Sequence, residues 1–233
     1  ALEMTTVAAK KLGLKGSNVL VASTGRIGVN LPMNPIRKGI KAVANDLKSS
    51  QHAATQTAEA IMTSDTKSKQ ISVEFKLGGK VVRLGGIAKG AGMIQPGMSP
   101  NGSQPVSSAS GLHATMLSFL TTDANISAGN IKKCLKEAVS KSFNSITVDG
   151  DMSTNDTVLL LANGLAGNRK LNDQDLKTFQ TSLNHVCLEL AKMIVRDGEG
   201  ITRVITVRIS GAKSFAEADN CLLYTSPSPR DPE

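Results

Sequence analysis

The segment ISVEFKLGGKVVRLGG, residues 71–86, decides the fold class. Its first half alternates apolar and polar residues, with the apolar ones at Ile71, Val73, Phe75 and Leu77. This period of two is typical of a strand with one buried face. Gly78 and Gly79 then turn the chain, and a second apolar run, VVRL, follows at residues 81–84. Two such runs joined by two glycines predict a β-hairpin.

Helical patterns lie on both sides of this hairpin. Upstream, residues 4–14, 34–47 and 53–62 are expected to form helices, the first of them ended by Gly13. Downstream, residues 128–143 and 171–195 carry apolar residues at helical spacing. The longest apolar stripe predicts the main core helix and consists of Leu176, Phe179, Leu183, Val186, Cys187, Leu190 and Ile194.

Further strands are expected from short apolar runs. We predict strands at residues 18–23, 115–121 and 201–209, and a strand with a turn at 146–151. Residues 153–164 fit either a strand or a helix. Strands mixed with helices around a hairpin predict a layered α/β (α+β) fold.

Composition limits the classes of function. The chain has 233 residues, 40% of them apolar, with a formal net charge of +8 and only 3% aromatic residues. A basic chain favours anionic partners, but the lysines and arginines are scattered and form no run. Binding to single-stranded nucleic acid by base stacking would need aromatic side chains. We therefore expect no nucleic-acid partner, and expect small acidic substrates instead.

Cysteine usage and hydropathy bear on the compartment. The three cysteines, Cys134, Cys187 and Cys221, form no metal-binding pair, and His52, His113 and His185 lack metal spacing. Sparse cysteines favour a reducing intracellular location. No apolar stretch reaches the roughly 20 residues of a membrane span. We expect a soluble intracellular protein without a membrane partner, and any targeting sequence would precede Ala1.

Thr115 stands where a Ser/Gly/Pro-rich segment gives way to a compact apolar run. One interpretation is a turn residue before a strand. The other is a nucleophile that self-cleavage after Ala114 would expose. A threonine hydroxyl is weak unless a base activates it, and an N-terminal threonine can use its own α-amine. That amine titrates near pH 8, which suits proton transfer.

Other polar residues could complete such a site. Thr24 and Gly25 follow an apolar run and can together donate hydrogen bonds to an oxyanion, although they also fit an ordinary turn. Lys89 lies among glycines and could hold a substrate carboxylate, or could be a surface lysine. Glu199, between two glycines, could hold an ammonium group or be a solvated turn residue.

Three aspartates, Asp149, Asp151 and Asp156, crowd a Ser/Thr-rich segment. Paired carboxylates can bind metal or carry acid/base chemistry, but the spacing of a calcium loop is missing. We favour a network of turn hydrogen bonds and helix capping.

Six motifs in order resemble one family along residues 1–217. They are VASTGRIGVNLPM (21–33), IMTSDT (61–66), GGIAKGAGMIQP (85–96), ATMLSFLTTDA (114–124), SFNSITVDGDMSTNDTVLLLANG (142–164) and RDGEGITRVITV (196–207). The chain resembles the ornithine acetyltransferases, which are bifunctional glutamate N-acetyltransferases of arginine biosynthesis. The resemblance implies a self-processing fold of the N-terminal-nucleophile type.

The resemblance also implies a mechanism. The precursor would cut itself between Ala114 and Thr115, and Thr115 would carry the acetyl group from N-acetylornithine to glutamate. Thr24 and Gly25 match the oxyanion-hole pair of the family.

The positions that contact the substrate in the same family match Thr63, Lys89, Thr115 and Glu199 of this chain. No metal and no bound organic cofactor are implied, and acetyl-CoA enters only as a substrate that some members accept. The α and β chains would stay together, as two of each. Bacterial relatives are cytoplasmic, and eukaryotic relatives occupy mitochondria or plastids.

Two segments depart from the family pattern. Residues 99–113 lengthen the path from Lys89 to Thr115, and removing them restores the family spacing. The segment is either a true insertion or an unspliced piece of the gene. The stretch CLLYTSPSPRD (221–231) matches an in-frame translation of a transposase adaptor used in sequencing libraries.

We therefore expect three parts. Residues 1–114 would be the C-terminal part of an α chain, 115–220 the N-terminal part of a β chain, and 221–233 a non-native tail. The alternatives are a self-processing aminopeptidase of the same fold and an inactive truncated fragment.

Overall fold

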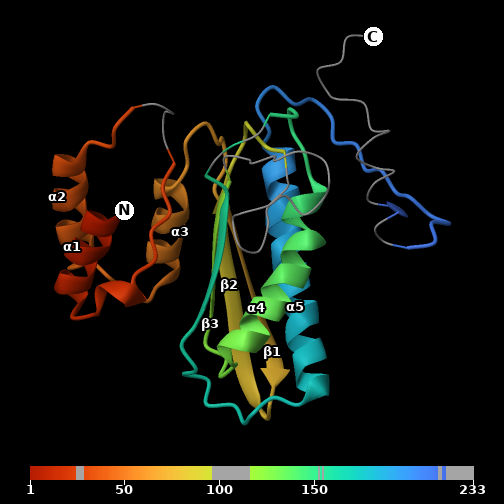
Figure 1. Cartoon of the computed structure of the whole chain (residues 1–233), viewed down its shortest axis with the longest axis horizontal. Helices are drawn as coiled ribbons and strands as arrows, with labels where there is room; N and C mark the ends of the chain where they lie inside the picture. The colour runs from red at the N-terminus through yellow and green to blue at the C-terminus, as the bar shows by residue number, and fades with distance from the viewer. Residues whose placement is uncertain (25–28, 96–115, 152, 154, 215–216, 219–233) are drawn as a thin grey trace. The chain divides into compact units, whose positions relative to one another are not determined.

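The computed structural model describes residues 1–24, 29–95, 116–151, 153, 155–214 and 217–218 (Figure 1). The chain divides into two compact units, residues 1–60 and residues 61–233. Each unit is described by itself below.

The predicted hairpin is confirmed and begins the sheet of the second unit. Strands β1 (Lys69–Leu77) and β2 (Lys80–Lys89) pair antiparallel, with Leu77 opposite Lys80. Gly78 and Gly79 both have positive φ angles, +54° and +82°. Glycine adopts this backbone conformation readily, because it lacks a Cβ. A tight two-residue connection can therefore close the hairpin.

Two further strands complete a mixed sheet in the order β1-β2-β3-β4. Strand β3 (Leu117–Thr122) pairs antiparallel with β2, and β4 (Thr157–Ala162) pairs parallel with β3. Helix α4 (Ala128–Ser140) and the short helix η2 (Phe143–Ser145) lie in the β3–β4 connection, as a parallel pair requires. The segment 153–164, which fitted either a strand or a helix, therefore contains a strand.

Helix α5 (Asp173–Arg196) supplies most of the core of the second unit. Asn172 and Asp175 form a capping box at its start, which satisfies amides that have no partner within the helix. Helices α4 and α5 lie side by side along the sheet (Figure 1). The predicted stripe is buried from Phe179 onward, at Phe179, Leu183, Val186, Cys187, Leu190 and Ile194. The layered α/β prediction is thus confirmed.

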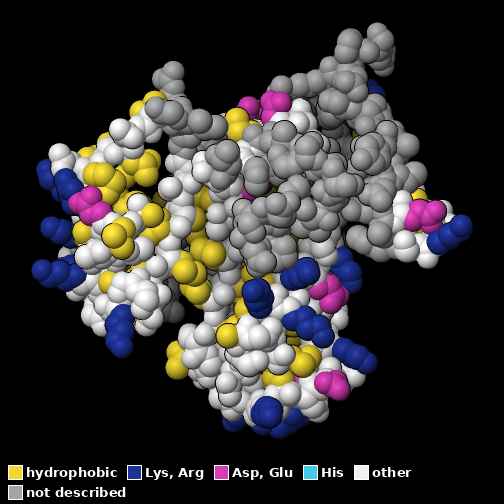
Figure 2. Space-filling model, viewed as in Figure 1, with side chains coloured by type: hydrophobic (Ala, Val, Ile, Leu, Met, Phe, Trp, Pro, Cys, Tyr) yellow, Lys and Arg dark blue, Asp and Glu magenta, His cyan; other side chains and the backbone are white. Residues whose placement is uncertain are grey.

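The first unit is helical and carries little core of its own. It contains α1 (Leu2–Leu12), η1 (Gly16–Asn18), α2 (Met33–Val43) and α3 (Gln51–Ala60), so its predicted helices are confirmed. Among its described residues, only Ala9 and Ala58 are buried apolar side chains. Several larger ones are exposed, including Leu20, Val43 and Leu47. Figure 2 shows many hydrophobic side chains on the surface of this unit.

Three strand predictions are wrong. Residues 18–23, 146–151 and 201–209 contain no strand in the structure. Residues 201–208 are mostly exposed, with Ile205 at 85%. An apolar run becomes a strand only when another strand pairs with it, and within the described residues none pairs with these segments.

No helix in the described part of the chain is both long and apolar enough to cross a bilayer.

Candidate active site

Lys89 is the last residue of β2, and it is buried, with 1% of its surface exposed. The alternative of a surface lysine is therefore wrong. In the sheet, Lys89 lies opposite Leu117, the first residue of β3. A lysine ammonium group is rarely this deeply buried unless charges or polar groups surround it.

The groups around Lys89 have opposing effects on its charge. Burial lowers the pKa of Lys89 below its ordinary value, and the positive charge of Lys69 adds to this effect. The negative charges of Asp65, Asp156 and Glu199 act in the opposite direction. A lysine with a lowered pKa and several charged neighbours is typical of a functional site.

The entrance to β3 is held by backbone and carboxylate hydrogen bonds. The N–H of Met116 donates to Oδ1 of Asp156 over 2.8 Å. The N–H of Thr157 donates to the carbonyl oxygen of Met116 over 3.0 Å. These bonds fix the backbone at the residue that follows Thr115 in the sequence. Thr115 itself lies outside the described residues, as do Ala114 and the insertion 99–113.

Glu199 lies in the turn after α5 and packs against the glycine segment that follows Lys89. Its N–H donates to the carbonyl oxygen of Ala91 over 2.7 Å. A Cβ atom built on Gly92 would lie 2.7 Å from Cδ of Glu199. Only a residue without a side chain allows this close approach. The Glu199 side chain is exposed, as expected for a solvated turn residue, and its charge still acts on Lys89.

The remaining predicted residues occupy different places. Thr63 is exposed, and its N–H donates to Oδ2 of Asp65 over 3.1 Å. Thr24 is half-buried in the first unit, and Gly25 lies outside the described residues. The structure therefore brings Lys89 and Glu199 into one region of the second unit. Asp65 connects Thr63 to this region, because it accepts hydrogen bonds from the N–H groups of both Thr63 and Gly90. The oxyanion pair stays a prediction.

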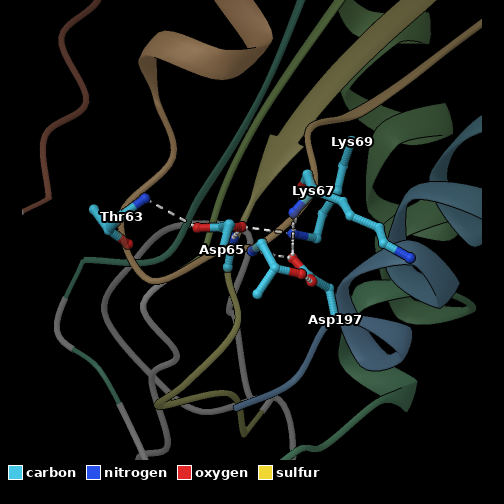
Figure 3. A network of polar contacts seen from close by, with 7 residues as sticks. Thr63, Asp65, Lys67, Lys69 and Asp197 are labelled. Carbon is cyan, nitrogen blue, oxygen red and sulfur yellow. Dashed lines mark hydrogen bonds and ion pairs between the residues drawn. The ribbon is translucent and has the colours of Figure 1, made fainter.

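A buried ion-pair network underlies this region, and the sequence analysis missed it (Figure 3). Nζ of Lys69 lies 2.6 Å from Oδ1 of Asp65 and 2.6 Å from Oδ2 of Asp197. All three side chains are at most 6% exposed. The only sequence signal was that Asp65 and Asp197 fall inside two of the quoted motifs, IMTSDT and RDGEGITRVITV.

The three aspartates of the 149–156 segment have two structural roles among the described residues. Asp149 accepts hydrogen bonds from the N–H groups of Met93, Ile94 and Asp151, and Asp156 accepts from Met116. The predicted turn network is therefore present. The helix-capping part of that prediction is wrong for α4 and α5, because Ser127 and Asn172 cap them. Within the described residues, no group of His, Cys, Asp and Glu side chains is arranged to hold a metal ion.

Two solved structures are similar to part of the chain. One is the arginine biosynthesis bifunctional protein ArgJ from Bacillus halodurans, 47% identical, with a TM-score of 0.34 over 36% of this chain and 39% of that one. The other is an L-aminopeptidase D-Ala-esterase/amidase from Ochrobactrum anthropi, 15% identical, with a TM-score of 0.35 over 57% and 42% of the two chains.

Sequence relatives cover the chain almost completely. A glutamate N-acetyltransferase of Methanocaldococcus jannaschii is 48% identical over 219 residues, which make up 94% of this chain and 50% of the relative. An arginine biosynthesis bifunctional protein ArgJ of Symbiobacterium thermophilum is 46% identical over 220 residues, with the same coverage. The chain thus spans about half the length of these relatives. The model of the ArgJ family matches residues 1–228, and the chain therefore belongs to the ArgJ family.

Proposed function

We propose that the protein transfers an acetyl group from N-acetylornithine to glutamate through an acetyl-threonine enzyme. The observation that carries this proposal is the buried, charge-surrounded Lys89 opposite the first residue of β3. A buried cation near the start of β3 suits a substrate carboxylate close to a nucleophile at Thr115. Family membership and the names of the two relatives support the same reaction.

The proposed reaction has two stages that share one nucleophile. First, Oγ of Thr115 attacks the carbonyl carbon of Ala114, the C–N bond between these residues breaks with proton transfer to the nitrogen, and an ester joins Ala114 to Oγ. Water then hydrolyses this ester, which leaves Ala114 with a free carboxylate and Thr115 with a free hydroxyl and a free α-amine. That amine then removes the proton from Oγ, which attacks the acetyl carbonyl of N-acetylornithine. The C–N bond breaks, and the proton goes to the departing amine. The amine of glutamate finally takes the acetyl group from Thr115.

The chain's own charges suit such substrates. Lys89 would bind a carboxylate of the amino acid, and Glu199 would bind an ammonium group. Thr63 would add a polar contact, and N–H and O–H groups of Thr24 and Gly25 would stabilise the oxyanion. Acetyl-CoA is a second acetyl donor to test.

The test follows both products of the reaction at once. Purified protein is incubated with N-acetylornithine and glutamate, and ornithine, N-acetylglutamate and acetate are quantified. Acetyl transfer predicts equal amounts of ornithine and N-acetylglutamate, and loss of both in Thr115→Ala. The matched control is Thr181→Ala, at an exposed threonine of α5 whose hydroxyl donates to the carbonyl oxygen of Lys177 in the same helix. Release of acetate without N-acetylglutamate would instead indicate a hydrolase, as in the aminopeptidase alternative.

Self-cleavage is tested on the same samples. Intact-mass measurement should find two polypeptides whose boundary falls between Ala114 and Thr115, and a single uncut chain in Thr115→Ala. A wild-type chain that stays uncut and transfers no acetyl group would identify an inactive fragment.

We further propose that residues 1–114 are α-chain, 115–220 are β-chain, 99–113 are an insertion and 221–233 are non-native. The subunits would assemble as two α and two β chains. Sequencing the source transcript and its genomic locus tests the boundaries. A mature transcript that stops after CLLYTSPSPRDPE would refute the tail assignment, and one that lacks codons 99–113 would refute the insertion.

A further inference from the structure

We propose that Lys69, Asp65 and Asp197, here called the Lys69 triad, are positioning residues for the acetyl-transfer site. The triad would hold three segments in fixed relation, those that carry Thr63, Lys89 and Glu199. This inference rests on the proposed function and deepens it, because it names residues that would act through the substrate contacts rather than on the substrate.

Lys69 is available only for structural contacts. An ammonium group has three hydrogen-bond donors. Those of Lys69 meet Oδ1 of Asp65 at 2.6 Å, Oδ2 of Asp197 at 2.6 Å and the carbonyl oxygen of Lys67 at 3.2 Å. No donor is left for a substrate carboxylate, and the side chain is only 2% exposed. Lys69 and Lys89 are therefore two buried lysines with different roles.

Asp65 joins the Thr63 segment to the Lys89 segment. Its Oδ1 accepts a hydrogen bond from the N–H of Gly90 over 2.7 Å, and its Oδ2 accepts one from the N–H of Thr63 over 3.1 Å. Gly90 is the residue next to Lys89 in the sequence. Figure 3 shows Asp65 between Thr63 and Lys69. A single carboxylate thus sets the backbone beside two of the predicted substrate contacts.

Asp197 adds the third segment. It follows the last residue of α5 and accepts hydrogen bonds from the N–H of Thr66 over 3.0 Å and from the N–H of Lys67 over 3.3 Å. The Thr66 hydroxyl also donates to its Oδ1. Two residues further on lies Glu199, whose N–H is bonded to Ala91. The position of Glu199 therefore depends on the link between Asp197 and the 66–69 segment.

The triad also affects the charge of Lys89. With two carboxylates and one ammonium group, it carries one net negative charge, which can balance the positive charge of Lys89. The charged groups that face Lys89 are Asp65, Lys69, Asp156 and Glu199. Removing the carboxylate charge of Asp65 should favour the neutral form of Lys89. Substrate binding by a cationic Lys89 would then fail at a lower pH than in the wild type.

Stability alone is a poor explanation for such a network. Replacing a whole buried ion pair by neutral groups is often harmless to stability, whereas removing one partner leaves an uncompensated charge. A positioning role and a stabilising role therefore predict different behaviour for a double variant that removes one Lys69–Asp197 pair.

The experiment compares Lys69→Met, Asp197→Asn, the double variant K69M/D197N and Asp65→Asn in the acetyl-transfer assay. The matched control is Lys141→Met, which removes an exposed ion pair with Glu137 on α4. We expect the double variant to regain part of the melting temperature lost in Lys69→Met, while its KM for glutamate stays raised by roughly tenfold or more, because small misplacements of bound groups have large effects. Asp65→Asn should move the alkaline loss of activity to lower pH. Lys141→Met should change neither property.

Two results would overturn the positioning role. One is a double variant with both wild-type stability and wild-type KM, and the other is an Asp65→Asn variant with an unchanged pH profile. Asp197→Asn, which is nearly isosteric, keeps the KM test decisive if Lys69→Met does not fold.

A wild-type protein without acetyl transfer would refute the proposed function instead. Amide hydrogen exchange then tests the triad directly. Lys69→Met should accelerate exchange at Thr63, Thr66 and Gly90 together, and Lys141→Met should not. Unchanged exchange at these three amides would show that the triad holds no segment in place.

Discussion

Lys69 and Asp197 are 128 positions apart in the sequence, and their side chains meet at 2.6 Å in the buried part of the second unit. The contact joins the start of β1 to the end of α5. These two elements also pack along their length, and the ion pair fixes how far one lies along the other. The glycine segment after Lys89 and the turn that carries Glu199 both lie at this end of the sheet.

The two aspartates that contact Lys69 predict acid sensitivity. Burial alone would raise the pKa of Asp65 and of Asp197, but hydrogen bonds outweigh it and hold both pKa values below the usual range. For Asp65 the bonds come from Lys69, Gly90 and Thr63. A carboxyl group with a depressed pKa stabilises the folded state above its unfolded pKa, and this stabilisation is lost as pH falls through the folded value.

We therefore expect the free energy of unfolding to fall steeply below about pH 4, the ordinary range of aspartate. Urea unfolding measured from pH 7 down to acid pH checks this. The Asp197→Asn variant, less stable at neutral pH, should show a shallower decline on acidification. An equally steep decline in that variant would assign the acid sensitivity to other carboxylates.

A side chain added to β2 should destabilise the protein at Gly86 and have little effect at the neighbouring Gly85. A Cβ atom at Gly86 would lie 2.5 Å from Cδ2 of Leu120 and 2.9 Å from Cδ1 of Leu190. The Gly86→Ala variant should therefore lose about 1–3 kcal/mol of stability through overpacking. Gly85→Ala is the neighbouring control, since its Cβ would meet nothing closer than 3.7 Å. Denaturant unfolding of both variants should separate them, and equal losses would contradict the packing argument.

Gly92 predicts an effect on activity rather than on stability. A Cβ atom there would overlap the Glu199 carboxylate, with 2.8 Å to Oε2. That carboxylate is the end of a flexible, exposed side chain, so it can move aside at little energetic cost. The Gly92→Ala variant should therefore keep its melting temperature and show a raised KM in the acetyl-transfer assay. Gly129→Ala, where nothing lies within 4 Å, serves as the control. A wild-type KM in Gly92→Ala would argue against a role for Glu199.

Both cysteines in the described part of the chain should resist thiol reagents. Cys134 and Cys187 are free and buried, and burial raises the pKa of the Cys187 thiol to about 12. The thiolate is the reactive form, so alkylation should require unfolding. Peptide mass mapping after labelling of native and of urea-unfolded protein checks this. Rapid native labelling of Cys187 would mean that α5 opens far more readily than its packing indicates.

The elements that short sequence patterns specify, the hairpin and helix α5, were predicted correctly from the sequence. The alternation at Ile71, Val73, Phe75 and Leu77 and the two turn glycines defined the hairpin, and the helical stripe beginning at Leu176 defined most of α5. The apolar runs at 18–23 and 201–209 resemble true strands in composition. Within the described residues, however, no strand pairs with them. Strand formation depends on a partner that can be remote in the sequence, and the sequence of a single segment does not identify that partner.

The residues of the candidate site likewise fall into two groups, those that the sequence predicted and those that only the structure shows. Lys89 and Glu199 were proposed from their glycine-rich surroundings, and the structure brings them together. The burial of Lys89 and the existence of the Lys69 triad were not predictable, because Lys69 looks like an ordinary polar start to a strand. Its partners Asp65 and Asp197 reach it from a preceding loop and from the end of α5. Only the folded chain reveals that these distant residues form a buried ion-pair network.

Strand β3 has hydrogen-bonded neighbours on both sides, β2 and β4. A cut between Ala114 and Thr115 would leave β1 and β2 in one polypeptide and β3 and β4 in the other. The sheet would then become an interface between two molecules. The precursor can fold in a first-order reaction, whereas the separated chains would have to find each other at a rate that depends on their concentration. Maturation would in this way be irreversible in practice: a denatured mature protein should recover poorly on dilution, and an uncut Thr115→Ala precursor should recover well.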